Sequence, residues 1–285
     1  MRRVWLIWVS ALLIALLVSG CAPVTDLSNQ TVTLENGVAG TLNRPAGVDN
    51  APVVLMLHGF GSSKDEVGGM YARLADALAA RGVGSLRIDF RGFGKSDGDT
   101  GSTTVGVQVE DAVAAYDYLA GLDWVDPERI GVIGFSLGGG VSTIAAAEHP
   151  DFFKSMVTWS SVGDMAPDFI DTLSQEAFDT AAAKGVVGLD LGWRTIVLKQ
   201  GFFESLAQYD LAQLITQYPG AYLAIAGDQD FSAAYAPGFV ESAQAAPKEV
   251  WIVPGGDHIF GVLTDDQTTA DSVIERTAQW FADTL

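Results

Sequence analysis

The chain contains 285 residues, 48% of them hydrophobic, which is enough for a large core and sets a prior of one or two domains. Its formal net charge of −19 argues against binding to nucleic acid and against an electrostatic attachment to anionic lipid. A single cysteine excludes an intrachain disulfide bond.

The first 21 residues differ in character from the rest of the chain. They read MRRVWLIWVSALLIALLVSGC, with two arginines, an apolar run of signal-peptide length, and small residues before Cys21. This run is short for a membrane-spanning helix, which needs about 20 apolar residues, although a retained anchor is the alternative. Residues 18–21 resemble a bacterial lipobox, which implies cleavage and diacylation of Cys21. We therefore expect an extracytoplasmic protein, lipid-anchored to the bacterial cell membrane, with residues 22–30 as a polar tether.

Beyond the tether, apolar runs of strand length alternate with helical patterns. An opening β-hairpin is expected to turn at Asn36-Gly37. Strands are expected at residues 52–59, 83–92, 129–136 and 154–161 and within 221–230 and 248–258, and helices at 65–82, 107–122, 137–150 and 268–285. Apolar strands separated by helices indicate an α/β fold, with a mostly parallel sheet covered by helices on both faces. Residues 31–285 are predicted to form this domain.

One interval interrupts the alternation of strands and helices. Between Ser161 and Pro219 there are helical patterns but no evident core strand, and the interval is longer than a βα unit requires. We expect an inserted helical cap over about 163–205, and then a helix over 202–219 that returns to the sheet. A pair of ordinary surface helices is the alternative. The apolar underside of the cap would be formed by Phe169, Phe178, Trp193, Phe202 and Phe203.

The stretch GFSLG, residues 134–138, lies directly after an expected strand and directly before an expected helix. In that setting, the G-x-S-x-G pattern is typical of a nucleophile elbow. The apex serine adopts a strained conformation, and the flanking glycines keep neighbouring side chains from colliding. Ser136 would then be exposed near a helix N-terminus, whose dipole favours a developing negative charge. Ser136 is therefore the predicted nucleophile.

A serine nucleophile needs a base, which is almost always histidine, and an acid that orients the histidine. Among the three histidines, His149 ends a helix and His58 is too close to a backbone turn to serve easily as a base. His258, on a glycine-containing loop after the last strand, is the predicted base. Asp228 and Asp230 both follow the penultimate strand. Asp230 is the better candidate for the acid, because Asp228 is expected to cap the turn.

Acyl transfer also requires backbone N–H groups that face the developing oxyanion. The N–H of Leu137, directly after the nucleophile, is one expected donor, and the N–H of Phe60 in HGFG is the other. Asp257, beside the predicted base, is expected to cap its own loop. The scattered histidines suggest no metal site. The sequence has no phosphate-binding glycine loop ending in Gly-Lys-Ser, and no cofactor is expected.

From about residue 30 to 285, the sequence resembles the serine α/β-hydrolase superfamily. The matching stretches, in the family's order, are LHGFGSSKDE, RIDFRGFGKSDG, RIGVIGFSLGGGVS, GDQD and GGDHIF. The similarity is greatest to small-cap carboxylesterases, the branch that includes bacterial cinnamoyl and feruloyl esterases and monoacylglycerol-lipase-like enzymes. The resemblance implies a catalytic triad of Ser136, Asp230 and His258 and oxyanion donors at Phe60 and Leu137. It also places Arg91 in a structural turn with Asp89 and Gly92, as scaffold.

The expected activity is hydrolysis of a small-molecule carboxylic ester, with a short- or medium-chain or aryl acyl group, through an acyl-enzyme intermediate. A serine peptidase or acyl-peptide hydrolase on the same fold is one alternative, and a catalytically silent binding module is another. A silent scaffold usually lacks a member of the triad, whereas this sequence has all three. The sequence leaves the particular ester and the oligomeric state open.

Overall fold

The structure is a computed structural model that describes residues 29–192 and 194–285. The predicted signal peptide with Cys21, nearly all of the predicted tether, and Trp193 lie outside these residues. Within the described ranges, no helix is both long enough and apolar enough to cross a lipid bilayer.

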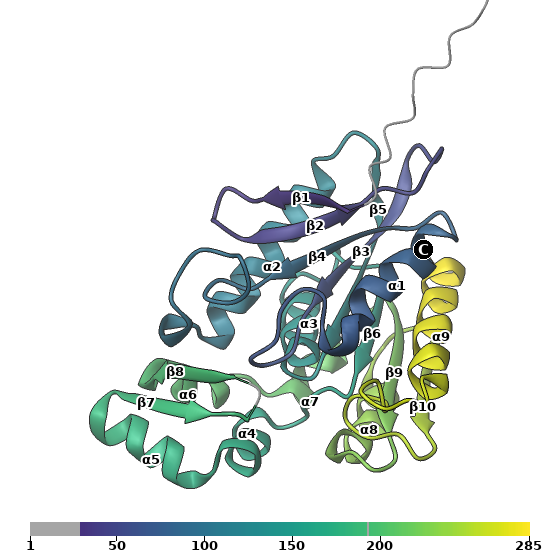
Figure 1. The fold of residues 1–285 in the computed structure, drawn as a ribbon. Coiled ribbons are helices and arrows are strands. Elements are labelled where there is room, and N and C mark those ends of the chain that lie inside the picture. The colour runs from purple at the N-terminus through teal and green to yellow at the C-terminus, as the bar shows by residue number, and fades with distance from the viewer. Residues whose placement is uncertain (1–28, 193) are drawn as a thin grey trace, which may run out of the picture.

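An eight-stranded sheet forms the centre of the fold, in the spatial order β1-β2-β4-β3-β5-β6-β9-β10 (Figure 1). The pairs β1–β2 and β2–β4 are antiparallel, and all the other neighbours in the sheet are parallel. The predicted opening hairpin and mostly parallel sheet are thus confirmed. The strands are β1 (Gln30–Thr33), β2 (Ala39–Asn43), β3 (Ala51–Leu57), β4 (Gly84–Asp89), β5 (Val125–Phe135), β6 (Ser155–Trp159), β9 (Ala221–Gly227) and β10 (Lys248–Val253).

Helices cover both faces of the sheet, as predicted. On one face, α1 (Met70–Ala79) packs against α9 (Thr268–Thr284). On the other face lie α2 (Val105–Ala120), α3 (Leu137–Glu148) and α8 (Ala236–Ser242). Each face therefore has its own hydrophobic layer between sheet and helices.

Helix α1 begins later than the predicted range of 65–82. The backbone φ angles of Glu66, Gly68 and Gly69 are 60°, 59° and 69°, which lie outside the right-handed helical region. Residues Val67–Gly69 form a short 3₁₀ turn instead, and the α-helix starts at Met70. The apolar periodicity predicts the body of the helix, but the two glycines before it belong to a turn.

Between β6 and β9, the chain leaves the main sheet. It forms α4 (Met165–Leu173), α5 (Gln175–Lys184), the strands β7 (Val186–Asp190) and β8 (Thr195–Lys199), and α6 (Gln200–Leu206). These elements lie together at one end of the molecule (Figure 1). The strands β7 and β8 form a separate antiparallel sheet in an interval where only helices were expected. Each strand is only five residues long, so its alternation of buried and exposed residues is too short to stand out beside the helical patterns.

The single helix predicted over 202–219 is wrong. The chain forms α6 and then a separate short helix, α7 (Leu211–Leu214), followed by a 3₁₀ turn. The Asp210 side chain accepts a hydrogen bond from the Gln213 N–H at 3.0 Å and so acts as the N-cap of α7. An aspartate that caps a new helix starts a second segment, even though the apolar pattern continues through it.

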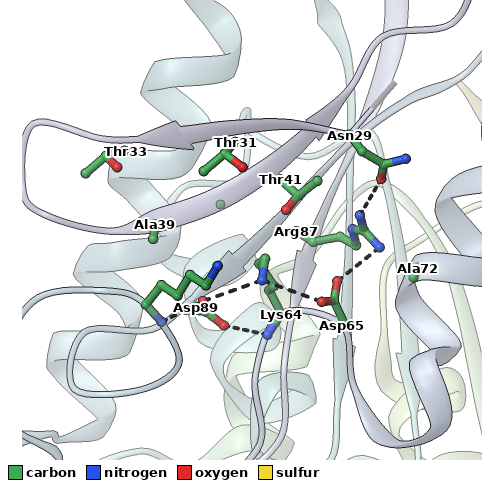
Figure 2. A pocket seen from close by; sticks show the side chains of 12 residues that line it. Asn29, Thr31, Thr33, Ala39, Thr41, Lys64, Asp65, Ala72, Arg87 and Asp89 are labelled. Atoms are coloured by element: carbon green, nitrogen blue, oxygen red, sulfur yellow. Dashed lines mark hydrogen bonds and ion pairs between the residues drawn. The ribbon is translucent and has the colours of Figure 1, made fainter. Parts of the chain in front are cut away.

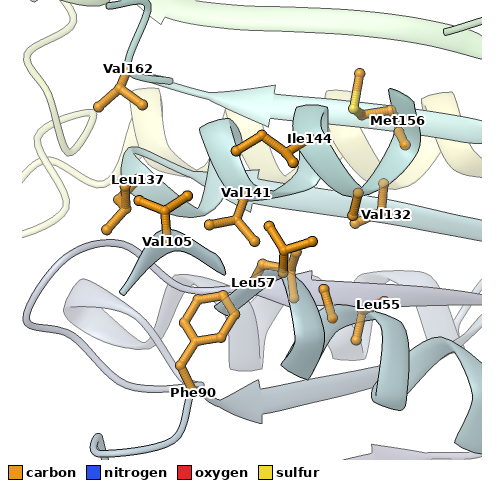
Figure 3. Close-up of a cluster of buried hydrophobic side chains, with 14 of the residues drawn as sticks. Leu55, Leu57, Phe90, Val105, Val132, Leu137, Val141, Ile144, Met156 and Val162 are labelled. Carbon is orange, nitrogen blue, oxygen red and sulfur yellow. The ribbon is translucent and has the colours of Figure 1, made fainter. Parts of the chain in front are cut away.

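The two hydrophobic layers follow from the alternation of side chains along each strand. In β3, Leu55 and Leu57 face the layer formed with α2 and α3, whereas Val54 and Met56 face the layer formed with α1 and α9. Figure 3 shows the first layer, in which Leu55 and Leu57 lie among side chains of β5 and α3. Every residue of β3 is buried, which explains its uninterrupted apolar sequence.

At β3, the connections between successive strands change the direction in which they cross the sheet. The neighbours of β3 are β4 on one side and β5 on the other, so the connections after β3 and after β4 run in opposite directions. In open α/β sheets, ligands bind outside the carboxyl ends of the strands at such a switch point. The loop that contains Phe60 and the turn that contains Ser136 both begin at this edge.

Replacing Leu55 with alanine is expected to lower the free energy of unfolding by about 2–5 kcal/mol, because the change leaves a cavity in a fully buried layer. Urea denaturation followed by circular dichroism measures this loss. Val186→Ala is the matched control, at a β7 residue that is 41% exposed, and should change the free energy by less than about 0.5 kcal/mol. Equal losses in the two variants would contradict the central position of Leu55.

Candidate active site

Ser136 lies between β5 and α3 in a backbone conformation that L-residues rarely adopt, with φ 53° and ψ −116°. A Cβ atom on Gly134 would lie 2.0 Å from the carbonyl oxygen of Gly138. A Cβ atom on Gly138 would lie 2.2 Å from the carbonyl oxygen of Leu57. Both glycines are therefore required, because the main chain passes too close to itself and to β3 for side chains to fit. The G-x-S-x-G spacing has this steric origin.

His258 lies within hydrogen-bonding distance of Ser136. Its Nε2 atom is 3.2 Å from the Ser136 Oγ, and it reaches this position from the loop between β10 and α9. The ring lies beside Phe135 and Phe231, at centroid distances of 5.1 and 5.4 Å. Its side chain is 35% exposed, so the imidazole remains accessible from solvent.

Asp230, and not Asp228, is the carboxylate that contacts this histidine. The Asp230 Oδ1 is 2.9 Å from the His258 Nδ1. The Asp228 side chain instead accepts a hydrogen bond from the Gly255 N–H at 2.8 Å, and thereby joins the loops after β9 and β10. Hydroxyl, imidazole and carboxylate thus form a continuous hydrogen-bonded arrangement, which we call the Ser136–His258–Asp230 line.

The environment of Asp230 favours its ionised form. Burial by itself would raise its pKa, but the hydrogen bond and the charge of His258, together with hydrogen bonds from Ser232, hold the pKa below the ordinary value. The side chain is 4% exposed. Asp257, the other acidic residue near the histidine, accepts hydrogen bonds from the N–H groups of Ile259 and Gly261 and so caps its own loop.

The two expected oxyanion donors lie on the loops at the switch point, Phe60 after β3 and Leu137 at the start of α3. Within the described part of the chain, neither backbone N–H has a protein acceptor. The Gly59 carbonyl oxygen, which belongs to the same peptide plane as the Phe60 N–H, accepts hydrogen bonds from His58 Nδ1 at 2.8 Å and from the Ser62 N–H at 3.3 Å. Because the peptide is planar and trans, this fixes the Phe60 N–H in the opposite direction.

His58 has a structural function that the sequence analysis did not assign. The Phe90 N–H donates to His58 Nε2 at 3.1 Å, so the ring proton lies on Nδ1 and is donated to Gly59. Burial lowers the pKa of His58 to about 4, which keeps the ring neutral. The His-Gly pair directly after β3 could have indicated this function, because a buried histidine beside a turn needs a hydrogen-bond partner for each ring nitrogen.

Arg91 pairs with acidic side chains of α2 and not with the Ser136–His258–Asp230 line. Its guanidinium pairs with Asp111, which is fully buried, and with Glu110 at 2.8 Å, both on α2. The Asp89 carboxylate accepts hydrogen bonds from the backbone N–H groups of two loops, at Lys64 and Lys95. These contacts hold neighbouring loops together and agree with a scaffold role.

The inserted segment contributes aromatic side chains beside the Phe60 loop. The Phe60 ring lies edge-on to Phe169 of α4 at 5.0 Å and stacks on Phe202 of α6 at 5.4 Å. Phe202 also contacts Phe203, which in turn contacts Phe178 of α5. The aromatic residues expected on the cap, apart from the undescribed Trp193, therefore form one contiguous apolar group.

A cavity of about 590 Å³, lined mainly by polar and charged residues, lies beside the β1–β2 hairpin (Figure 2). Arg87, on its floor, pairs with Asp65 at 3.1 Å and donates to Asn29 at 2.9 Å. The residues of the Ser136–His258–Asp230 line do not line this cavity. Within the described ranges, no group of histidine, cysteine and acidic side chains is arranged to hold a metal ion.

Comparison with known proteins agrees with this architecture. Residues 52–192 match a sequence profile described as the α/β hydrolase fold. A 31.7 kDa Escherichia coli protein from the traX–finO intergenic region is 33% identical over 115 residues, which are 40% of this chain and 39% of that protein. The chain thus spans about two fifths of the length of this curated relative.

Among solved structures, Est1E from Butyrivibrio proteoclasticus with bound ferulic acid superimposes with a TM-score of 0.73 at 21% identity, covering 90% of this chain and 98% of that one. The esterase domain of a Rhodothermus marinus protein gives a TM-score of 0.66 at 26% identity, covering 89% and 98%. Together with the sheet order and the serine turn, these likenesses show that the chain has the α/β-hydrolase fold.

Gly138→Ala is expected to destabilise the protein by several kcal/mol, because the added methyl group would collide with the backbone of Leu57 rather than with a movable side chain. Thermal unfolding followed by circular dichroism measures the effect. Gly188→Ala on β7 is the control, since a Cβ atom there meets no atom within 4 Å. A Gly138→Ala variant as stable as this control would refute the steric account of the serine turn.

Proposed function

We propose that this protein is a serine esterase that hydrolyses carboxylic esters through an acyl-enzyme intermediate. The observation that carries the proposal is the Ser136–His258–Asp230 line, with 3.2 Å between hydroxyl and imidazole and 2.9 Å between imidazole and carboxylate. Its position at the carboxyl edge of the sheet, where ligands of this fold class bind, adds support. The likeness to an esterase domain at 26% identity supports the same reaction class.

In the proposed reaction, Ser136 Oγ attacks the ester carbonyl carbon while His258 Nε2 takes its proton. Asp230 stabilises the resulting imidazolium and holds the ring with Nε2 toward the serine. The N–H groups of Phe60 and Leu137 stabilise the oxyanion. The imidazolium then gives its proton to the leaving alkoxide as the C–O bond breaks. A water molecule, deprotonated by His258, attacks the acyl-enzyme, and Ser136 recovers its proton as the acid leaves.

The acyl group is proposed to be apolar, of short or medium chain length or aromatic. Phe60 carries a proposed oxyanion donor on its backbone, while its ring packs against Phe169 and Phe202 of the inserted segment. An acyl group whose carbonyl lies at that donor would therefore have apolar aromatic surface nearby. The ferulic acid bound to Est1E is an aromatic acid, which supports including aryl esters among the candidates.

The proposal is tested by measuring kcat/KM for p-nitrophenyl esters of increasing acyl length, a feruloyl ester and a peptide amide. We expect ester turnover and labelling of Ser136 by a fluorophosphonate probe. Ser136→Ala should lose both activities while keeping the circular dichroism spectrum of the wild type. Amide cleavage without ester cleavage would favour a peptidase instead, and the absence of labelling would favour a silent binding module.

The two aspartates of the β9 loop provide a matched test of the acid. Asp230→Asn should lower kcat by about 10³- to 10⁴-fold, because an asparagine can hold the imidazole in the wrong tautomer and does not stabilise its positive charge. Asp228→Asn, two residues away, should lower kcat far less, because that side chain accepts a hydrogen bond from the Gly255 N–H and does not contact the histidine. Steady-state kinetics at saturating ester measure both. A larger loss in Asp228→Asn would overturn the assignment.

We further propose that a lipid on Cys21 holds the enzyme at the outer side of a bacterial membrane. The support comes from the sequence of residues 1–21, with its basic start, apolar run and lipobox-like end. Cys21→Ser should move the protein from the detergent phase to the aqueous phase after Triton X-114 partitioning. Retention of this variant in the detergent phase would indicate an uncleaved hydrophobic anchor.

A further inference from the structure

Glu66 carries a carboxylate that the proposed reaction does not use, although it lies on the same loop as Phe60. Its Oε1 accepts a hydrogen bond from the Gly59 N–H at 2.5 Å. Its Oε2 accepts hydrogen bonds from the Ser62 hydroxyl at 2.9 Å and from the Val67 N–H at 3.1 Å. One side chain therefore joins the start, the middle and the end of the loop between β3 and α1.

The backbone of Glu66 is held in an unfavourable conformation. Its φ of 60° and ψ of 177° lie in a region that residues other than glycine rarely adopt. Such strain persists only where the surrounding contacts outweigh it. The three hydrogen bonds of the carboxylate are contacts of this kind, and they require the side chain to point back toward Gly59.

These contacts complete the fixation of Gly59, the residue before the proposed oxyanion donor. Its carbonyl oxygen is held by His58 and Ser62, and its N–H is held by Glu66. A Cβ atom at Gly59 would lie 2.8 Å from the Phe135 ring, so the residue also fits closely against β5. With both peptide planes of Gly59 fixed, the direction of the next N–H, that of Phe60, is fixed as well.

We propose that Glu66 is a positioning residue for oxyanion stabilisation: its carboxylate holds Gly59 so that the Phe60 N–H faces the oxyanion before substrate arrives. This inference rests on the proposed esterase function. A donor fixed in advance stabilises the transition state without reorganisation, so loss of Glu66 should lower kcat more than it raises KM.

The charge state of Glu66 adds a second readout. Burial raises its pKa to about 7, while hydrogen bonds from Gly59, Ser62 and Val67 and the charge of His258 act in the opposite direction. Three other ionisable groups lie near Glu66: Tyr71 on α1, and Lys64 and Asp65 on the same loop as Glu66. Burial and the charge of Glu66 raise the pKa of Tyr71. Above the pKa of Glu66 the charged carboxylate accepts stronger hydrogen bonds, and below it they weaken. The fixation of Gly59 should therefore weaken as the pH falls through about 7.

The test compares Glu66→Ala and Glu66→Gln with Asp65→Asn as the matched control. Asp65 is the adjacent acidic residue, and its side chain pairs with Arg87 and Lys64 instead of Gly59. With a p-nitrophenyl ester, Glu66→Ala should lose about 10- to 100-fold in kcat with little change in KM, a fraction of the loss of a whole oxyanion donor. Glu66→Gln, which keeps the side-chain shape and one acceptor oxygen, should lose less kcat than Glu66→Ala. The kcat of Asp65→Asn should stay within about twofold of the wild-type value. Fluorophosphonate labelling of Ser136 should slow in the same order.

A spectroscopic measurement tests the contact without relying on activity. In ¹H–¹⁵N spectra of the wild type and of Asp65→Asn, the Gly59 amide signal should shift with pH around 7, and this shift should be absent in Glu66→Gln. If Glu66→Ala does not fold, Glu66→Gln supplies both the kinetic and the spectroscopic comparison. A Gly59 signal that titrates identically in Glu66→Gln overturns the proposal.

The outcomes separate this inference from the esterase proposal. If Glu66→Ala folds and keeps the wild-type kcat, the role of Glu66 is refuted and the esterase proposal stands. If only Glu66→Gln folds, a wild-type kcat in that variant has the same meaning. A wild type that neither hydrolyses esters nor labels at Ser136 would refute the esterase and, with it, this role. Slowed kcat with an unchanged KM, together with loss of the Gly59 titration, would support both.

Discussion

The close approach of two backbones, at the end of β3 and at the start of α3, is the constraint on which the site depends. Gly138 lies against the carbonyl oxygen of Leu57 with no space for a side chain. This contact brings the serine turn next to the loop that carries Phe60, although the two are far apart in the sequence. Because backbone atoms cannot yield as side chains can, the relative position of Ser136 and the Phe60 loop is set by the sheet itself.

The two histidines of the site illustrate how burial assigns different chemistry to one side chain. His58 is enclosed beneath the Phe60 loop, and its pKa of about 4 keeps it a neutral hydrogen-bonding group at any physiological pH. His258 is partly exposed, with Asp230 on one nitrogen and Ser136 on the other. The first is suited to hold a peptide plane in place, and the second to accept and return a proton. With Glu66, the loop before α1 is held by polar contacts on both sides of Gly59.

The segment between β6 and β9 links the apolar side of the site to the rest of the domain. Phe169 and Phe202 contact the ring of Phe60, so the inserted helices and the Phe60 loop share one packed group. The inserted segment is also held by hydrogen bonds: Asp168 of α4 accepts one from the Gly163 N–H and one from the Tyr235 hydroxyl. Tyr235 follows Asp230 on the β9 loop, so the start of the inserted segment is connected to the loop that carries Asp230.

The sequence by itself determined the mostly parallel sheet, the serine turn and His258 as the residue that faces this turn. The signals for these features are apolar runs, glycine spacing and the order of motifs, all of which can be seen in the chain without its tertiary contacts. The sequence favoured Asp230 over Asp228 as the partner of the histidine, but both residues follow the same strand, and the position of the β10 loop decides which one meets the histidine. The start of α1, the break before α7 and the β7–β8 hairpin were likewise decided by turn geometry, capping and long-range pairing. The tertiary structure alone brought Glu66 to Gly59, because a contact between a side chain and a backbone group within an irregular loop leaves no periodic mark in the sequence.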